Sequence, residues 1–277
     1  MQIIDGKKLR NEILTRVETD VAALSFQPVF CDVLVGDDPA SAQYVRMKAK
    51  TAESVGIKFY NANFSKDIST ESLIEEIMKI NKIPHMCGII VQLPLPESLD
   101  KRKILDAIDS HLDVDCLGTD ASKEFYSGNI LLGFPTALSC MALLDSIGID
   151  LKNKNIVVLG HGDLVGKPVE ALLKFRDLNP IVISRKTENK EELIKNADII
   201  ISGMGHGKFI TGNMVKDGVI LIDAGTSESN AGIVGDVDFE SVKNIASFIS
   251  PVPGGVGPVT VAMLLNNVLS VAKYYVK

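Results

Sequence analysis

Short, almost wholly apolar stretches alternate with longer amphipathic ones along this chain, and this alternation constrains its fold more than any other feature. Residues 28–36 precede a helical pattern at 40–55 that stops at Gly56, and residues 57–64 precede one at 70–81. Apolar strands that alternate with helices are typical of a parallel sheet whose two faces are covered. The sequence therefore predicts an α/β fold.

The same pattern divides the chain into two series of elements. The first series also contains an amphipathic helix at 7–24, a strand that begins at 87 and is cut by Pro94 and Pro96, and a short helix at 100–109. In the second series, which begins near 151, we expect strands at 155–160, 180–185, 198–205, 218–225 and 246–252, and helices at 165–175 and 190–197. An apolar helix at 134–147 and a last helix at 258–273 complete the chain. We therefore expect two α/β units joined near 120–150, with the last helix packing back on the first unit.

Composition excludes several classes of function. A chain of 277 residues, 46% hydrophobic and 23% charged, is globular, and a net charge of −6 without a basic stripe does not favour nucleic acid as a partner. The four cysteines show no C-x-x-C spacing, which argues against a zinc site or a disulfide framework and is typical of a cytoplasmic protein. No signal peptide is recognisable and no apolar run approaches the length of a membrane span, so we expect neither a membrane nor a metal as a partner.

A glycine-rich turn in the second series predicts a nucleotide site. Gly160, Gly162 and Gly166 follow a buried strand and open a helix, with one residue more than the usual dinucleotide spacing. Glycines there let the backbone approach phosphate oxygens at the positive end of the helix. The alternative is a tight turn between strand and helix that binds nothing.

The end of the next strand bears on which nucleotide is bound. An NAD site usually has an acidic residue there, but this chain has Ser184, Arg185 and Lys186. Two cations suit a 2′-phosphate, so the sequence favours NADP over NAD. The alternative is that Arg185 and Lys186 simply solvate a strand end.

Polar residues in the first series suggest a second site. Tyr44 and Lys48 are four residues apart, which places them on one face of a helix. Gln92 ends a buried strand, where ligands of parallel sheets lie. Asp115 is suited to the paired N–H groups of a heterocycle, whereas Asp113 fits a turn or a cap. Each of these residues alone also fits an ordinary surface position.

A third stretch of interest is residues 250–260, SPVPGGVGPVT. Three prolines and three glycines precede an apolar helix. Proline fixes φ and glycine permits close approach to the backbone, so the stretch is either an ordinary loop before a helix or a loop shaped to hold a ligand.

Together these motifs resemble the bifunctional methylenetetrahydrofolate dehydrogenase/methenyltetrahydrofolate cyclohydrolase family over essentially the whole chain. The matching motifs, in chain order, are YVRMKAK at 44–50, VQLPLP at 91–96, DVD at 113–115, LGHGDLVGKP at 159–168 and PVPGGVGPVT at 251–260. Five motifs in register are highly specific.

The resemblance implies NADP-dependent oxidation of 5,10-methylenetetrahydrofolate and hydrolysis of the methenyl product to 10-formyltetrahydrofolate, as in one-carbon metabolism and purine biosynthesis. It implies a homodimer, with a folate-binding catalytic domain of residues 1–119 plus the last helix at 258–277. Residues 120–257 would form a Rossmann-type nucleotide-binding domain, with a cleft between the two.

The resemblance also implies residue roles. Lys48 would be the main catalytic group of the hydrolysis, Gln92 would position it, Tyr44 would stack on the folate and Asp115 would bind the pterin. The remaining substrate contacts would be Val91, Leu93, Pro253, Gly254, Gly255, Val256 and Gly257. The nucleotide contacts would be Gly160, His161, Gly162, Ser184, Arg185, Lys186 and Thr226.

Several positions depart from the family pattern. Cys116 replaces the usual glycine after Asp-Val-Asp, and Phe134-Pro135-Thr136-Ala137 replaces Pro-Cys-Thr-Pro. His161-Gly162 replaces Arg-Ser in the nucleotide loop, which removes a charged hydrogen bond that Arg185 or Lys186 would have to supply. The alternatives are therefore a monofunctional cyclohydrolase, or a non-catalytic folate- or nucleotide-binding protein with a degraded nucleotide site.

Overall fold

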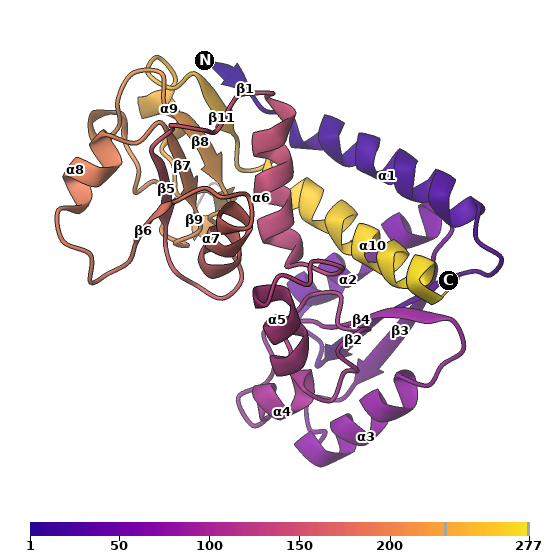
Figure 1. Ribbon diagram of the computed structural model, residues 1–277. Coiled ribbons are helices and arrows are strands. Elements are labelled where there is room, and N and C mark those ends of the chain that lie inside the picture. The colour runs from indigo at the N-terminus through magenta and orange to yellow at the C-terminus, as the bar shows by residue number, and fades with distance from the viewer. Residues whose placement is uncertain (230–231, 276–277) are drawn as a thin grey trace. The chain divides into compact units, whose positions relative to one another are not determined.

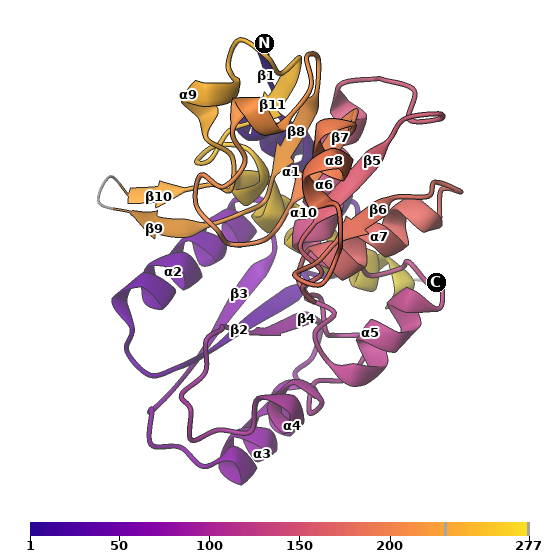
Figure 2. The ribbon, with the colours of Figure 1, turned by 90° about the vertical axis from the view of Figure 1, so that its left-hand side faces the viewer.

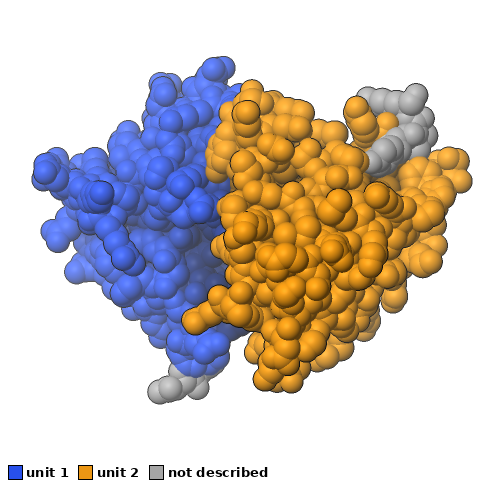
Figure 3. All heavy atoms as spheres, turned by 90° about the horizontal axis from the view of Figure 1, so that it is seen from below, with its two compact units in different colours: residues 1–11, 136–263 blue, residues 12–135, 264–277 orange. Residues whose placement is uncertain are grey.

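The computed structural model describes residues 1–229 and 232–275. The chain forms two compact units, which Figure 3 colours separately: unit 1 contains residues 1–11 and 136–263, and unit 2 contains residues 12–135 and 264–277. The unit boundaries thus follow residues 11, 135 and 263, whereas the sequence places domain boundaries after 119 and 257. The first eleven residues carry no sequence signal that assigns them to the second series.

Unit 1 is built on a six-stranded parallel sheet with strand order β1-β11-β8-β7-β5-β6 (Figure 1). Its strands are β1 (Gln2–Ile3), β5 (Ile156–Leu159), β6 (Ile181–Ile183), β7 (Ile199–Ser202), β8 (Ile220–Asp223) and β11 (Phe248–Ser250). Because β5 pairs with β6 on one side and β7 on the other, the strand order reverses at β5. This switch point is where Rossmann-type sheets bind nucleotides, so the predicted fold class is confirmed.

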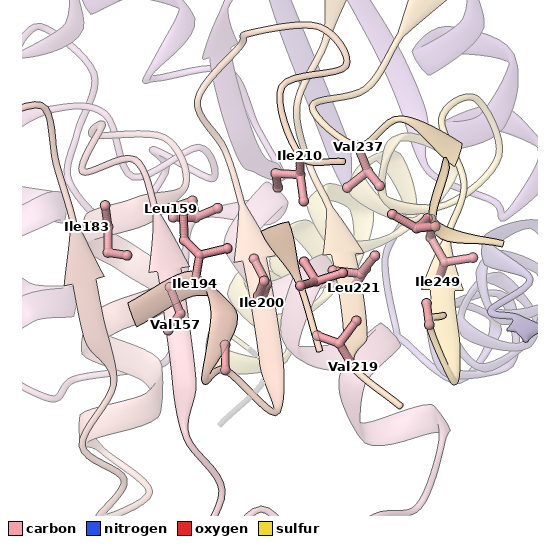
Figure 4. Packing of buried hydrophobic residues seen from close by; sticks show 14 residues of the cluster. Val157, Leu159, Ile183, Ile194, Ile200, Ile210, Val219, Leu221, Val237 and Ile249 are labelled. Carbon is pink, nitrogen blue, oxygen red and sulfur yellow. The ribbon is translucent and has the colours of Figure 1, made fainter. Parts of the chain in front are cut away.

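Apolar strands fill the core of unit 1. Figure 4 shows side chains of Leu159 on β5, Ile200 on β7, Leu221 on β8 and Ile249 on β11 in one cluster, which Ile194 of α8 covers. All these side chains are 5% exposed or less. Strands buried on both faces explain the near-continuous apolar runs in the sequence.

The other elements of unit 1 surround this sheet. They are α6 (Pro135–Ser146), α7 (Gly166–Lys174), α8 (Lys190–Lys195), the 3₁₀ turn at Gly212–Met214, the antiparallel pair β9 (Ser227–Ser229) and β10 (Gly232–Val234), and α9 (Phe239–Val242). The sequence predicted α6, α7 and α8. It did not predict β1, α9 or the β9–β10 pair, because elements of two to four residues are too short to show a period.

Unit 2 contains a three-stranded parallel sheet with order β3-β2-β4, whose strands lie side by side in Figure 2. The strands are β2 (Val29–Val35), β3 (Lys58–Phe64) and β4 (Met86–Val91), and the helices are α2 (Pro39–Ser54), α3 (Thr70–Ile80), α4 (Lys101–Leu105) and α5 (Thr119–Tyr126). Helix α1 (Gly6–Ala22) begins in unit 1 and ends in unit 2. The chain begins α2 sharply, because the Asp38 carboxylate accepts a hydrogen bond from Ser41 N at 2.7 Å and Pro39 fits the first helical turn.

The last helix, α10 (Val256–Tyr275), begins in unit 1 and ends in unit 2. The side chain of Asn267 donates hydrogen bonds to Val114 O (2.8 Å) and Gly133 O (2.7 Å), and Lys273 forms an ion pair with Asp20 on α1, which runs beside α10 (Figure 1). The prediction that the last helix packs back on the first series is confirmed.

The expectation that no apolar run approaches the length of a membrane span was wrong for α10. Residues 256–274 are long and apolar enough to span a membrane by length and composition alone, with a mean hydropathy of 1.3 over an 18-residue window. However, 61% of that window is buried within the structure. A core helix that packs against apolar neighbours on most sides has the same composition as a spanning helix.

Candidate active site

Lys48 is a buried cation on α2. Its residue surface is 2% exposed, and its Nζ donates a hydrogen bond to Gln92 Oε1 at 2.8 Å. The Tyr44 ring, one helical turn earlier, lies with its centroid 4.8 Å from the same nitrogen. The structure therefore brings together three of the residues that the sequence singled out, and the ring stabilises the ammonium by a cation–π contact.

The amide of Gln92 is oriented by its own backbone surroundings. Gln92 follows Val91, the last residue of β4; its N–H donates to Val33 O at 2.9 Å and its Nε2 donates to Leu93 O at 2.8 Å. Because Nε2 is occupied in this way, Oε1 is the atom that faces Lys48. Val91 is buried and Leu93 is half-buried, and the Leu93–Pro94 peptide bond is cis.

The two aspartates of the Asp-Val-Asp turn differ in what they contact. The Asp113 carboxylate is buried and accepts a hydrogen bond from Gly118 N at 2.7 Å, so Asp113 closes the turn. Asp115 is half-buried, and burial raises its pKa to about 6, although the charge of Lys48 lowers it. The charge of Lys48 thus acts on Asp115 as well as on the residues that contact it.

Two departures from the family pattern lie in buried surroundings. Cys116 is buried with φ at +58°, in the left-handed region that favours glycine, which is the residue that the family usually has there. Phe134 packs edge-on against Phe125 of α5, with ring centroids 5.1 Å apart.

Asp32 is a member of the site that the sequence did not reveal. This residue lies in the middle of β2 and is 0% exposed, and its Oδ2 lies 2.5 Å from Lys48 Nζ. Burial raises the pKa of Asp32, and the charge of Lys48 opposes that rise. The available signal was a single carboxylate in VFCDVLV, a strand otherwise made of apolar residues.

In the glycine-rich turn of unit 1, packing explains two of the three glycines. Gly160 has φ at +92°, and a Cβ there would lie 2.8 Å from Gly203 O; a Cβ on Gly166 would overlap Gly160 O. A Cβ on Gly162 would meet no protein atom within 4 Å. The turn therefore needs Gly160 and Gly166 for its shape, but its packing does not explain Gly162.

His161 lies between these glycines and is tied to α7. Its Nε2 lies 2.9 Å from Glu170 Oε2. Burial raises the pKa of Glu170, but hydrogen bonds from Lys174 and His161 outweigh that effect and lower it below its usual value. A carboxylate that is ionised at neutral pH thus contacts the side chain that stands where the family usually has arginine.

The remaining predicted nucleotide residues lie at the ends of strands in unit 1. After β6, Ser184 N donates to Thr187 Oγ1 at 2.9 Å and Lys190 Nζ donates to Arg185 O at 2.7 Å, which fixes the turn and leaves the Arg185 and Lys186 side chains exposed. Thr226 is exposed between β8 and β9.

The proline- and glycine-rich loop belongs to unit 1. Gly254 has φ at +113°, Gly255 N donates to Pro251 O at 2.7 Å, and a Cβ on Gly6 would overlap Gly255 O. Val256 and Gly257 are the first residues of α10, which begins two residues earlier than predicted. Pro253 is exposed, and its peptide bond with Val252 is cis.

A doubly wound parallel sheet with a glycine-rich turn at its switch point, together with a second parallel unit that carries a buried lysine and amide, defines a class. It is the class of two-domain enzymes that use a nicotinamide dinucleotide. Within residues 1–229 and 232–275, no group of three His, Cys, Asp or Glu side chains is arranged to hold a metal ion.

Comparison with known proteins identifies the family within this class. Residues 4–115 match the catalytic domain of tetrahydrofolate dehydrogenase/cyclohydrolase, and residues 135–276 match the NAD(P)-binding domain of the same family. The chain therefore belongs to the tetrahydrofolate dehydrogenase/cyclohydrolase family, as the sequence motifs predicted.

The relatives match over their whole length. The chain is 43% identical to the bifunctional protein FolD of a Nitratiruptor species, over 99% of this chain and 98% of the relative. The crystal structure of the bifunctional enzyme FolD from Campylobacter jejuni has a TM-score of 0.94 at 36% identity and covers 99% of both chains. The Trypanosoma brucei enzyme, complexed with NADP cofactor and an inhibitor, has a TM-score of 0.92 at 32% identity, over 99% of this chain and 98% of that one.

Proposed function

We propose that this protein oxidises 5,10-methylenetetrahydrofolate with NADP and hydrolyses the methenyl product to 10-formyltetrahydrofolate. The observation that carries the proposal is the buried Lys48, held by Gln92 and stacked on Tyr44 within the stretch that matches the family's catalytic domain. The Campylobacter jejuni relative carries both activities, dehydrogenase and cyclohydrolase, in its name.

For the hydrolysis, the proposal gives each residue of unit 2 a task. Water adds to the cationic methenyl carbon, one ring C–N bond breaks and a proton is released, so the site must orient water and tolerate a changing charge. Lys48 and Gln92 orient the reacting groups, and Tyr44 provides an aromatic face for the flat substrate. Asp115 would accept hydrogen bonds from the pterin, a role that rests on the family resemblance.

For the oxidation, NADP supplies a hydride acceptor when it is bound, and the chain supplies alignment. The backbone around Gly160, His161 and Gly162 would hold the phosphates at the start of α7. Arg185 and Lys186, with Ser184 and Thr226, would contact the ribose and its 2′-phosphate. The residues fit the cofactor, because Gly162 is free of packing constraints and both cations are exposed.

The proposal also covers the location, the oligomeric state and the domain roles of the protein. We propose a cytoplasmic homodimer that acts on tetrahydrofolate derivatives in one-carbon metabolism, with a folate domain in the first series and a nucleotide domain in the second. Contacts of Pro253, Gly254, Gly255, Val256 and Gly257 with the substrate rest on the family resemblance.

A monofunctional cyclohydrolase is the second candidate function, and the contact between His161 and Glu170 favours it. That contact holds a carboxylate next to the nucleotide loop, where it opposes a phosphate. The Lys48 group in unit 2 does not depend on it.

Absorbance kinetics test the proposal. Purified protein is mixed with methylenetetrahydrofolate and either NADP or NAD, and formation of the reduced nicotinamide is followed; hydrolysis is followed separately with added methenyltetrahydrofolate. We expect both reactions, with NADP preferred. Hydrolysis without reduction of either cofactor would support the monofunctional alternative, and the absence of both reactions would refute the proposal.

A further inference from the structure

Asp32 is a carboxylate in the middle of a buried strand. It lies on β2, the central strand of its sheet, and pairs in register with Asn61 on β3 and Ile90 on β4. The side chain is 0% exposed, and every other residue of β2 is apolar. A charge in such a place is strongly unfavourable unless another group compensates it, so packing of the sheet does not explain this aspartate.

The compensating group is Lys48. Its Nζ lies 2.5 Å from Asp32 Oδ2, and the two side chains are 3% and 0% exposed. The contact between these two atoms is an ion pair and lacks the geometry of a hydrogen bond. Asp32 Oδ1 has no hydrogen-bond partner within the described part of the chain. The pair is therefore held mainly by charge, in surroundings where charge interactions are screened weakly.

Lys48 is consequently anchored on two sides. The Gln92 oxygen accepts one of its N–H groups at 2.8 Å, and the Asp32 carboxylate neutralises its charge from β2. A lysine side chain has four rotatable bonds and a mobile end, so two anchors from different elements restrict where Nζ points.

Other ionisable groups face this pair. Asp115 interacts with the charges of both Lys48 and Asp32, and Tyr44 on α2 has a pKa raised to about 12 by burial and by the charges of Asp115 and Asp32. The neighbouring Cys31 thiol has a pKa raised by burial and by the Asp32 charge. Asp32 is thus the carboxylate in contact with the Lys48 ammonium, and Asp115 adds a second negative charge that acts on both.

We infer that Asp32 is a positioning residue for the hydrolysis: its carboxylate is the counter-charge that keeps Lys48 as an ammonium, held toward Gln92. The inference rests on the proposed function, since it concerns the working form of Lys48 in that reaction. The ammonium orients water or substrate through an N–H that Gln92 does not take. Without the carboxylate, Lys48 Nζ is held less firmly in place and the ammonium loses its counter-charge.

The test is the pH profile of the Asp32→Asn variant. The rate of methenyltetrahydrofolate hydrolysis is measured across pH for wild type and variant, with the uncatalysed rate subtracted. We expect kcat near neutral pH to fall about tenfold or more, with KM changed less than about threefold, because positioning rather than binding is lost. The alkaline limb of the profile should move to lower pH, because an opposite charge in contact with the ammonium is removed.

Asp113→Asn is the matched control, because it neutralises another buried aspartate of unit 2 that does not contact Lys48. Its alkaline limb should stay at the wild-type pH. An Asp32→Asn profile that keeps both its limb and its kcat, or a limb that moves to higher pH, would overturn the inference. If Asp32→Asn does not fold, Asp32→Ser provides the same comparison.

A double-mutant cycle separates this inference from the proposed function. Urea unfolding of Asp32→Asn, Lys48→Met and the double variant should give a double-variant loss clearly smaller than the sum of the single losses. Additive losses would overturn the inference. A wild-type protein that does not hydrolyse the substrate refutes the proposed function, whereas an active wild type with an unchanged Asp32→Asn refutes this inference alone.

Discussion

Buried charge determines how single residues of unit 2 behave. Lys48, Asp32 and Asp113 are each 2% exposed or less, yet their surroundings differ. Lys48 and Asp32 compensate each other, whereas Asp113 relies on a backbone N–H of Gly118. The same burial therefore has a functional consequence in one case and a consequence for stability in the other.

Lys48→Met should remove most of the hydrolysis. General acid–base and positioning groups contribute about 10²–10⁴-fold, so kcat should fall within that range while the protein remains folded. Lys50→Met is the control, because Lys50 is exposed on the same helix and should be dispensable. Equal rates for wild type and Lys48→Met in a stopped-flow assay would contradict the assigned role.

Asp113 should make stability depend on pH in a defined direction. Burial raises its pKa from 3.8 to about 7, against the hydrogen bond from Gly118, so the folded state binds a proton that the unfolded state has lost between these values. This favours folding at low pH, and the advantage is lost as pH rises through about 7. The free energy of unfolding should therefore fall as pH rises between these values, by up to about 1.4 kcal/mol per pH unit from this group.

Asp113→Asn keeps an acceptor for Gly118 N but cannot titrate. Denaturant unfolding from pH 4 to pH 8 should show a flatter dependence in this variant than in wild type. Some slope should remain, because burial also raises the pKa values of Asp115 and Asp223 to about 6. Identical slopes for the two proteins would show that Asp113 is ionised throughout.

At the level of helices and strands, local sequence signals decide which elements could be predicted. The amphipathic patterns predicted α1, α2, α3 and α7 to within a few residues, because their apolar spacing and their caps are local properties. Elements without such signals were missed: β1 has two residues, and its pairing with β11 depends on residues about 245 positions away.

The C-terminal end of α7 offers a stabilising substitution. Asp177 has φ at +57°, and the bonds from Asp177 N to Lys174 O and from Leu178 N to Leu173 O form a Schellman motif. Asp177→Gly should raise the free energy of unfolding by about 1 kcal/mol, because glycine adopts this conformation without strain. Asn179→Gly, where φ is not positive, should not raise it, and thermal unfolding of both variants makes the comparison.

The glycines of the nucleotide turn allow a paired test. Gly162→Ala should leave thermal stability unchanged but weaken NADP binding about tenfold, equivalent to about 1.4 kcal/mol, since its Cβ would meet no protein atom. Gly166→Ala should instead destabilise the fold by about 1–3 kcal/mol, because its Cβ would overlap Gly160 O. Titration calorimetry and thermal unfolding distinguish the two, and unweakened binding by Gly162→Ala would argue against a phosphate at this turn.

Across the whole chain, α10 connects segments that are far apart in sequence. Asn267 is buried and satisfies the carbonyls of Val114 and Gly133, 153 and 134 residues away. Asn267→Ala should lower the free energy of unfolding by about 2–4 kcal/mol, because two buried acceptors lose their partner. Asn266→Ala is the control at a half-buried neighbouring position, and urea unfolding that gives equal losses would contradict this account.

The sequence by itself determined the α/β class, most of the longer elements and the residues in the family motifs. These follow from local spacing, such as the four residues between Tyr44 and Lys48, or from glycines at a strand-to-helix turn. The exposed cations Arg185 and Lys186 were predicted in the same way, from their position at a strand end.

Only the tertiary structure decided which of these residues meet, and which residues were overlooked. In the sequence, Asp32 is one polar residue in an apolar strand. Its role in the site depends on Lys48 of α2, whose Nζ lies 2.5 Å from its carboxylate. The unit boundaries, the pairing of β1 and the two hydrogen bonds of Asn267 are likewise set by distant segments. Spacing along the chain encodes local periodicity, whereas the electrostatic environment of a buried group depends on neighbours that sequence separation does not reveal.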